Sequence, residues 1–418
     1  MLLNKARAVD YLHRCGIDAV IAASPTHVTY LTDYRYWLDA TMRRYMSRPG
    51  DTSDLALENY AVLTADGDGT LIVSSSQMPE TEASWVTEVR VYGDFGLDTS
   101  LMPAELADQA RLWLNRLQRE RAPLATDELI SVLHDHNLDR SRLGLECEGL
   151  LPGVREKLAA AFPQAVFLDC TNMLRLVRAV KSPEEISRLT RAAEIAEQAA
   201  QMCLNLAAPG RMLADLVATY RVGLAEHGAD MDHLIFAVHG LGIGSEPSYR
   251  LKAGDVVLVD YGCRFRHYIS DTGLTLALGE LPAPLQDRYL ALYDALEAGA
   301  ALLRPGVLAS AVRAAMRDSL AQRGIAMCYA HGHGFGLEVR DYPIIVEATG
   351  LPLKDDCIDV PSDLPLETDM VLNLEAPLYL AGAASLQIER TFRVTPAGPQ
   401  ALVAQDRRQP FRPESARC

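Results

Sequence analysis

Five residues in the second half of the chain have the types and spacing of a metal site: Asp260, Asp271, His333, Glu375 and Glu389. Each lies in a short apolar segment, where a buried carboxylate without a partner costs several kcal/mol. Four carboxylates and one imidazole form a ligand set suited to two divalent ions of Mn, Co, Zn or Fe. The sequence therefore predicts a dinuclear metal site. The alternative is that these are isolated residues at strand ends that face solvent.

The spacing of the carboxylates indicates two β-hairpins. Asp260 and Asp271 lie on apolar runs joined by the polar stretch CRFRH, and Glu375 and Glu389 lie on runs joined by AGAAS. Cross-strand neighbours approach each other to about 5 Å at Cβ. Each hairpin can therefore bring its two carboxylates to a common ion.

The segments that must position these residues indicate two domains, residues 1–172 and 173–418. In the first, strand-like runs (16–24, 59–66, 69–76, 165–170) accompany helix-like runs (101–122, 153–162), which is typical of an α/β domain. Ser182, followed by Pro183 and acidic residues, predicts a helix start. Pro-Gly pairs at 209–210 and 305–306 precede two similar helical segments. They predict an internal repeat, although such a pair can also arise by chance in an Ala/Leu-rich chain.

The five motifs, together with the segments Gly16–Trp37 and Leu174–Ala199, resemble the pita-bread metallopeptidase family of creatinase, prolidases and Xaa-Pro aminopeptidases. The resemblance implies a creatinase-like α/β N-terminal domain and an α+β pita-bread catalytic domain with a pseudo-twofold repeat. It implies that Asp260 binds one metal, that His333 and Glu375 bind the other, and that Asp271 and Glu389 bridge them. The implied nucleophile is water activated between the metals. A homodimer is implied as well, with the partner's N-terminal domain near the active site.

Composition excludes several classes of partner. The formal net charge of −15 argues against nucleic acid and against an anionic membrane. No apolar stretch approaches the roughly 20 residues of a transmembrane helix. Because the start of the chain has no continuous signal-peptide core and the cysteines are scattered, we expect a cytoplasmic protein.

Two positions depart from the family pattern. Ser248 stands in Pro-Ser-Tyr, where peptidases of the family usually have a histidine that contacts substrate or relays a proton. Arg340 stands in GLEVRDYP, where a second histidine is usual. His239, in AVHGLGIGSEP, could take over part of the first role, or it could be an ordinary loop histidine.

Arg340 stays charged, so it cannot relay a proton, but its guanidinium can bind a carboxylate through two parallel hydrogen bonds. We therefore expect a substrate with an anionic group near the scissile bond. The alternative is an ion pair between Arg340 and the neighbouring Asp341 or a remote acid.

Two further groups of residues lead to expectations about the site. Tyr36 and Trp37, with Arg43 and Arg44, form an aromatic and basic cluster. This cluster could contact the substrate, or it could be a solvated loop. We expect His331, two residues before His333, to point away from the site and to be structural.

The predicted function is hydrolysis of an amide or another C–N bond in a small carboxylate-bearing metabolite or dipeptide. One alternative is a metal-dependent lyase acting on a small zwitterion, similar to dimethylsulfoniopropionate lyase. Another is a conventional Xaa-Pro aminopeptidase or dipeptidase. A third is a catalytically inactive binding protein, against which the intact ligand set argues.

Overall fold

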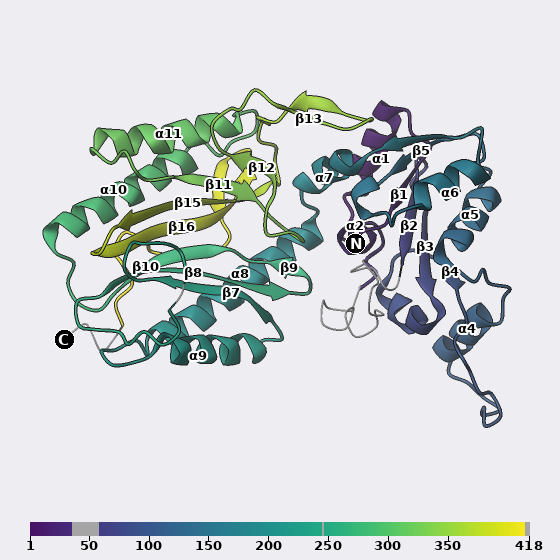
Figure 1. Cartoon of the computed structure of the whole chain (residues 1–418), viewed down its shortest axis with the longest axis horizontal. Coiled ribbons are helices and arrows are strands. Elements are labelled where there is room, and N and C mark those ends of the chain that lie inside the picture. Colours follow the sequence, from purple (N-terminus) through teal and green to yellow (C-terminus); the bar gives the residue numbers. More distant parts are fainter. Residues whose placement is uncertain (36–57, 245, 414–418) are drawn as a thin grey trace. The chain divides into compact units, whose positions relative to one another are not determined.

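The computed structural model describes residues 1–35, 58–244 and 246–413, which form two compact units (Figure 1). Unit 1 comprises Met1–Arg178 and Leu353–Val360, and unit 2 comprises Ala179–Pro352 and the chain from Pro361 onward. The predicted boundary at residue 172 falls inside helix α7 (Thr171–Ala179). Within the described residues, no helix is both long and apolar enough to cross a membrane.

Unit 1 is built on a six-stranded mixed sheet of order β4-β3-β2-β1-β5-β6. The strands are β1 (Ala19–Ala22), β2 (Tyr60–Thr64), β3 (Gly69–Ser74), β4 (Glu88–Tyr92), β5 (Arg142–Leu145) and β6 (Val166–Asp169). The helices are α1 (Lys5–Cys15), α2 (Pro25–Thr32), α4 (Asp108–Leu117), α5 (Ala125–Asp135), α6 (Val154–Ala161) and α7. The segment Leu353–Val360 of unit 1 forms a separate two-stranded sheet from β13 (Pro352–Lys354) and β14 (Asp359–Pro361).

The predicted strands and helices of unit 1 are present, with one helix shortened. The four strand-like runs contain β1, β2, β3 and β6, and the run 153–162 contains α6. The run 101–122 forms a helix only over Asp108–Leu117. Pro103 cannot continue a helix begun before it, and Pro123 disfavours helical residues just ahead of it. The α/β class of this domain is therefore confirmed.

Unit 2 contains a nine-stranded sheet whose main path runs β12-β11-β15-β16-β10-β8-β7, with β9 paired to β8 and β17 to β16. Its strands are β7 (Asp230–Ala237), β8 (Val256–Phe265), β9 (Tyr268–Ile269), β10 (Thr272–Ala277), β11 (His331–Gly334), β12 (Asp341–Ile345), β15 (Val371–Leu380), β16 (Ala384–Thr395) and β17 (Gly398–Ala401). Its helices are α8 (Pro183–Leu204), α9 (Leu213–Ala225), α10 (Ala283–Ala300) and α11 (Ala309–Gln322).

The start of α8 has the predicted cap. The Ser182 side chain accepts a hydrogen bond from the Glu185 amide, and the Glu185 carboxylate accepts one from the Ser182 amide, with Pro183 in the first turn. This reciprocal arrangement satisfies two backbone donors that a helix start leaves unpaired.

The internal repeat is confirmed in both sequence halves of unit 2. Gly210 and Gly306, the glycines of the two Pro-Gly pairs, have left-handed φ values of 88° and 87°. Each glycine amide donates to a leucine carbonyl of a later segment, at 2.7 Å to Leu251 and 2.8 Å to Leu366. Helices α9 and α11 follow these turns. The pair α8–α9 packs with β7, β8 and β10, and the pair α10–α11 packs with β15 and β16 (Figure 1).

The alternation of side chains along each strand places apolar residues on one face of this sheet and ionisable residues on the other. In β15, Leu372, Leu374 and Ala376 belong to the core with α10 and α11, whereas the intervening Glu375 points to the other face. In β8, Val259 and Tyr261 belong to the core with α8 and α9, whereas Asp260 does not. Side chains alternate between faces along a strand. The helices therefore cover one face, and the ionisable residues gather on the other.

Candidate metal centre and active site

A cavity of about 370 Å³, on the face of the unit 2 sheet opposite helices α8 to α11, brings all five predicted metal-binding residues together with Arg340. Asp260 comes from β8, His333 from β11, Glu375 from β15 and Glu389 from β16, while Asp271 lies between β9 and β10. Five further polar lining residues were not predicted or were assigned elsewhere: His233, Tyr329, His331, Tyr379 and Gln387.

The first predicted hairpin is present, with β8 reversing through Arg266 and His267 into β9 and then β10. Both turn residues have positive φ, 47° and 73°. Asp260 pairs with Gly273 across β8 and β10. The two carboxylate oxygens of Asp271 face different histidines: Oδ1 is 3.4 Å from Nε2 of His233, and Oδ2 is 3.5 Å from Nε2 of His333. Asp271 thus stands between two halves of the cavity.

The second predicted hairpin places Glu375 directly opposite Glu389 across β15 and β16. Like charges in such a cross-strand pair repel each other, so either a nearby cation or a proton on one of the two carboxyl groups stabilises this arrangement. Gly273 leaves space for Glu389, because a Cβ at residue 273 would lie 2.8 Å from Oε2 of Glu389 and 2.5 Å from Nε2 of Gln387.

Three histidines face the cavity with the same ring orientation. Nδ1 lies 3.0 Å from Oδ2 of Asp232 in His233, 2.8 Å from the Tyr329 carbonyl in His331, and 3.0 Å from the Gly334 carbonyl in His333. Each acceptor favours a proton on Nδ1. With Nδ1 held in this way, Nε2 of each ring faces the carboxylates of the cavity.

The expectation that His331 points away from the site is wrong. Its Nε2 lies 2.8 Å from Oε1 of Glu375, its cross-strand neighbour. Residues two apart in a strand share a face, so His331 must accompany His333. This rule could have placed His331 in the site from sequence alone.

The electrostatics of the cavity favour a bound cation. Burial and the carboxylates of Asp271 and Asp260 raise the pKa of Glu389 well above its ordinary value. Burial lowers the pKa of His333, which keeps its imidazole in the neutral form that binds metals. Burial also tends to lower the pKa of His233, but hydrogen bonds to Asp232, Asp260 and Asp271 raise it to about 12. This donor set fits divalent metal ions.

Two amide side chains hold the carboxylates in place. Nδ2 of Asn373 donates to Oε1 of Glu389 at 2.7 Å and to Oδ2 of Asp271 at 3.1 Å. Nε2 of Gln387 donates to Oε2 of Glu389 at 2.6 Å. Asn373 and Gln387 are spaced by two from Glu375 and Glu389, so strand alternation could have identified both.

The other predicted site residues lie in different surroundings. Arg340 is exposed at the cavity, and it forms no ion pair with the carboxylates of the described chain. Ser248 is exposed and does not line the cavity. His239 does not line it either; its ring packs edge-on against Tyr249, with Nε2 3.7 Å from Oε1 of Glu246. Tyr36, Trp37, Arg43 and Arg44 lie outside the described residues.

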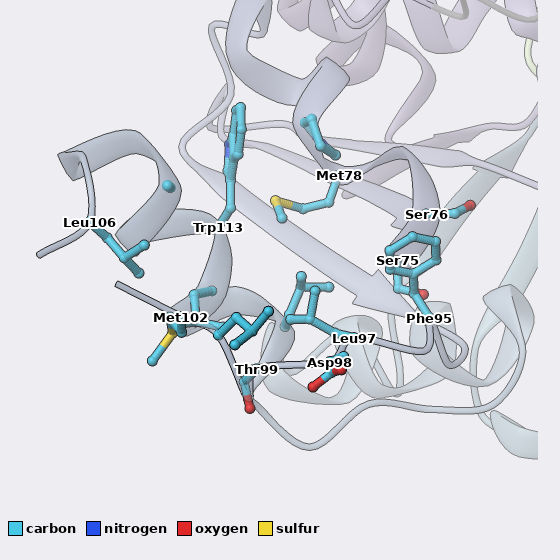
Figure 2. Close-up of a pocket in the computed structure, with 15 residues that line it drawn as sticks. Ser75, Ser76, Met78, Phe95, Leu97, Asp98, Thr99, Met102, Leu106 and Trp113 are labelled. Atoms are coloured by element: carbon cyan, nitrogen blue, oxygen red, sulfur yellow. The ribbon is translucent and has the colours of Figure 1, made fainter. Parts of the chain in front are cut away.

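A second cavity, of about 440 Å³, lies in unit 1 and has a different character (Figure 2). Its lining, as far as the structure describes the chain, is mostly apolar and includes Met78, Leu97 and Trp113, with Asp98 as the one charged residue. Since this lining offers no cluster of ionisable groups, this cavity has no counterpart of the carboxylate and histidine cluster in unit 2.

Comparison with known proteins agrees with this architecture. The profile of metallopeptidase family M24 matches residues 187–396, and the creatinase/prolidase N-terminal domain matches residues 5–180. The uncharacterised peptidase YqhT of Bacillus subtilis is 28% identical over 266 residues, which cover 62% of this chain and 71% of YqhT. The probable dipeptidase PepE of Mycobacterium bovis is 32% identical over 237 residues, which cover 54% of this chain and 59% of PepE.

A solved structure shows the same fold over nearly the whole length. The prolidase of Pyrococcus horikoshii superposes with a TM-score of 0.71 at 21% identity, covering 96% of this chain and 98% of the prolidase. The chain belongs to metallopeptidase family M24 and is a metallohydrolase. Peptidases of this family are metal-dependent, and the carboxylate and histidine cluster is a possible metal site.

Proposed function

We propose that the chain is a dinuclear metal-dependent hydrolase that cleaves an amide or another C–N bond close to a carboxylate in a small substrate such as a dipeptide. The observation that carries the proposal is the convergence of the five carboxylate and imidazole residues with Arg340 on one cavity. Its volume of about 370 Å³ lies near the lower end for small-molecule sites, which supports a small substrate.

In this proposal Asp260 would hold one ion, His333 and Glu375 would hold the other, and Asp271 and Glu389 would be shared by both. The opposed directions of the two Asp271 oxygens support a bridging role. Bound divalent ions would supply Lewis acidity toward water and toward the scissile carbonyl.

Other residues of the cavity would bind and orient the substrate. The exposed Arg340 guanidinium would hold the substrate carboxylate through paired hydrogen bonds. Ile235, Val339 and Pro377 give the cavity apolar walls that would exclude water from the reacting bond. Mn, Co, Zn and Fe remain the candidate metals, and a homodimer remains a prediction from the family resemblance.

No observation favours the lyase alternative, since the relatives are named as peptidases, a dipeptidase and a prolidase.

The proposal can be tested by supplying metal-loaded enzyme with dipeptides in ¹⁸O-labelled water. We expect ¹⁸O in the newly formed carboxylate, and slower cleavage of dipeptides whose C-terminal carboxylate is amidated. An unsaturated product without ¹⁸O would replace the hydrolase with a lyase. Equal rates for free and amidated dipeptides would remove the carboxylate from the recognition scheme.

A further inference from the structure

His233 lies beside Asp260 and Asp271 although it is not one of the five predicted ligands. It comes from β7, where an irregularity in the pairing with β8 between Met231 and His233 sets its register opposite Gly262. Gly262 leaves room for the imidazole, because a Cβ there would lie 2.5 Å from Cε1 and 3.0 Å from Nδ1 of His233. The backbone around His233 therefore makes space for its ring.

Asp232 orients the ring of His233 through Nδ1. Its Nδ1 lies 3.0 Å from Oδ2 of Asp232, and the other oxygen of Asp232 accepts from Nη2 of Arg264 at 3.0 Å. A carboxylate that binds Nδ1–H in this way commonly orients a metal-binding histidine and makes its other nitrogen more basic.

The other ring nitrogen of His233, Nε2, faces two carboxylates. Nε2 lies 3.1 Å from Oδ1 of Asp260 and 3.4 Å from Oδ1 of Asp271. Ligand atoms of His233, Asp260 and Asp271 all lie within 4.8 Å of one another, as atoms around one ion do. With Nδ1 as donor, Nε2 faces two anionic oxygens, so either a proton on Nε2 or a metal ion must lie between them.

We infer that Nε2 of His233 is an additional nitrogen ligand to the ion that Asp260 and Asp271 hold. The inference rests on the proposed metal site and extends its ligand set. Each of the two ions then receives one imidazole, from His233 on one side and from His333 on the other. Imidazole favours Zn, Co and Fe, whereas an all-oxygen site suits Mn. The ion beside His233, Asp260 and Asp271 should therefore be Zn, Co or Fe in preference to Mn.

The test compares the wild type with His233→Phe, which keeps a planar ring but has no nitrogen. His227→Gln is the matched control, because His227 hydrogen-bonds to the Gly223 carbonyl at the end of α9 and does not line the cavity. Each protein is loaded with zinc, and zinc X-ray absorption counts the imidazoles bound per chain. Calorimetry with zinc and with manganese gives the affinity of each ion.

We expect His233→Phe to lose one metal-bound imidazole per chain and to bind one zinc ion at least about 10-fold more weakly. The preference of that site for zinc over manganese should shrink, while His227→Gln should match the wild type. An unchanged imidazole count and unchanged affinities in His233→Phe would overturn the inference, leaving His233 a protonated partner of Asp260 and the five-residue site intact. A wild type that binds neither ion would instead overturn the proposed function and this inference with it.

Discussion

Glu389 is almost fully buried, and its nearest hydrogen-bond donors are the neutral amides of Asn373 and Gln387. Neutral donors stabilise a carboxylate, but they do not balance its charge. Among the lining residues that the structure describes, Arg340 is the only lysine or arginine, and it is exposed. Arg340 and His233, whose pKa is raised to about 12, can balance at most two of four ionised carboxylates, and this excess of negative charge is the physical basis of the proposed metal site.

Glu389→Ala should abolish turnover while the fold is retained, because the change removes a proposed bridging ligand and a carboxylate that is costly to bury. Activity, circular dichroism and metal content test this expectation. Glu297→Ala is the matched control, since Glu297 pairs with Arg390 at 2.6 Å and does not line the cavity. Activity of Glu389→Ala close to that of the control would contradict the bridging role.

Arg340 offers a test of substrate recognition. Arg340→Lys keeps the charge but loses the paired hydrogen bonds, so KM should rise although the substitution looks conservative. Arg340→His should weaken the native reaction and raise any trace peptidase activity, since it restores the group that relatives usually have. Steady-state kinetics on both variants measure these effects. Wild-type KM and kcat in both would make Arg340 a structural residue and remove the inference of a carboxylate substrate.

Much of the site could be predicted from single residues, because a charge inside an apolar strand is conspicuous. Asp260, Glu375 and Glu389 interrupt runs whose neighbours pack against helices, and this pattern is visible in the sequence. His233 could not be found in this way. Its position depends on the irregular register of β7 against β8 and on the space above Gly262, which only the folded sheet defines.

At the scale of elements, the two β-hairpins hold most of the functional groups. Both hairpins were predictable from the spacing of the carboxylates and from the polar or small residues between them. The full order of the sheet places β11 beside β15 and β16 beside β10. This order could not be predicted from the sequence, because those pairings join segments far apart in the chain. The helix pairs that support the two halves follow from the Pro-Gly turns.

In unit 1, Glu146 joins the end of β5 to the start of α2. Its Oε2 accepts from the amides of Ala23 and Ser24, at 2.8 and 2.9 Å, and its Oε1 pairs with Nδ1 of His27. Burial alone would raise the pKa of Glu146, but His27 and Ser24 lower it to about 2. A carboxylate with a lowered pKa stabilises the fold when it is ionised, here by roughly 3 kcal/mol.

This contribution should be present above about pH 4.5 and should be lost as the pH falls toward 2, because the folded carboxylate resists protonation longer than the unfolded one. Glu146→Gln should be less stable at pH 7 and should lose less stability in that range. Tryptophan fluorescence during denaturation reports on this part of the chain, as Trp37, Trp85 and Trp113 all precede residue 179. The exposed Glu148 supplies the control Glu148→Gln. Parallel pH profiles of wild type and Glu146→Gln would argue against the role of Glu146.

At the scale of the whole molecule, the chain has the fold of a peptidase family, and the family resemblance predicts that its auxiliary groups are altered. Membership of family M24 and the likeness to a prolidase define the scaffold. By that resemblance, Ser248 and Arg340 stand where histidines are expected, and His239 lies away from the lining of the cavity. The scaffold therefore predicts the class of reaction better than it predicts the substrate.

We expect poor activity toward ordinary Xaa-Pro peptides for this reason. Each missing histidine removes a proton relay or a transition-state hydrogen bond worth on the order of 100-fold in rate. Metal-loaded enzyme should therefore show kcat/KM below about 10⁴ M⁻¹s⁻¹ on Xaa-Pro dipeptides. Efficient cleavage above that value would show that other groups replace the histidines and that the chain is a conventional member.

The most direct test of the central claim is a titration of metal-free protein with a single divalent metal, in which bound metal per chain and hydrolytic activity are followed together. The proposed site predicts that activity rises to its maximum as the second equivalent binds, and that chelation removes it reversibly. Glu389→Ala should bind fewer ions and stay inactive throughout. Full activity in protein stripped of metal, or a maximum already reached with one ion bound, would contradict the dinuclear account.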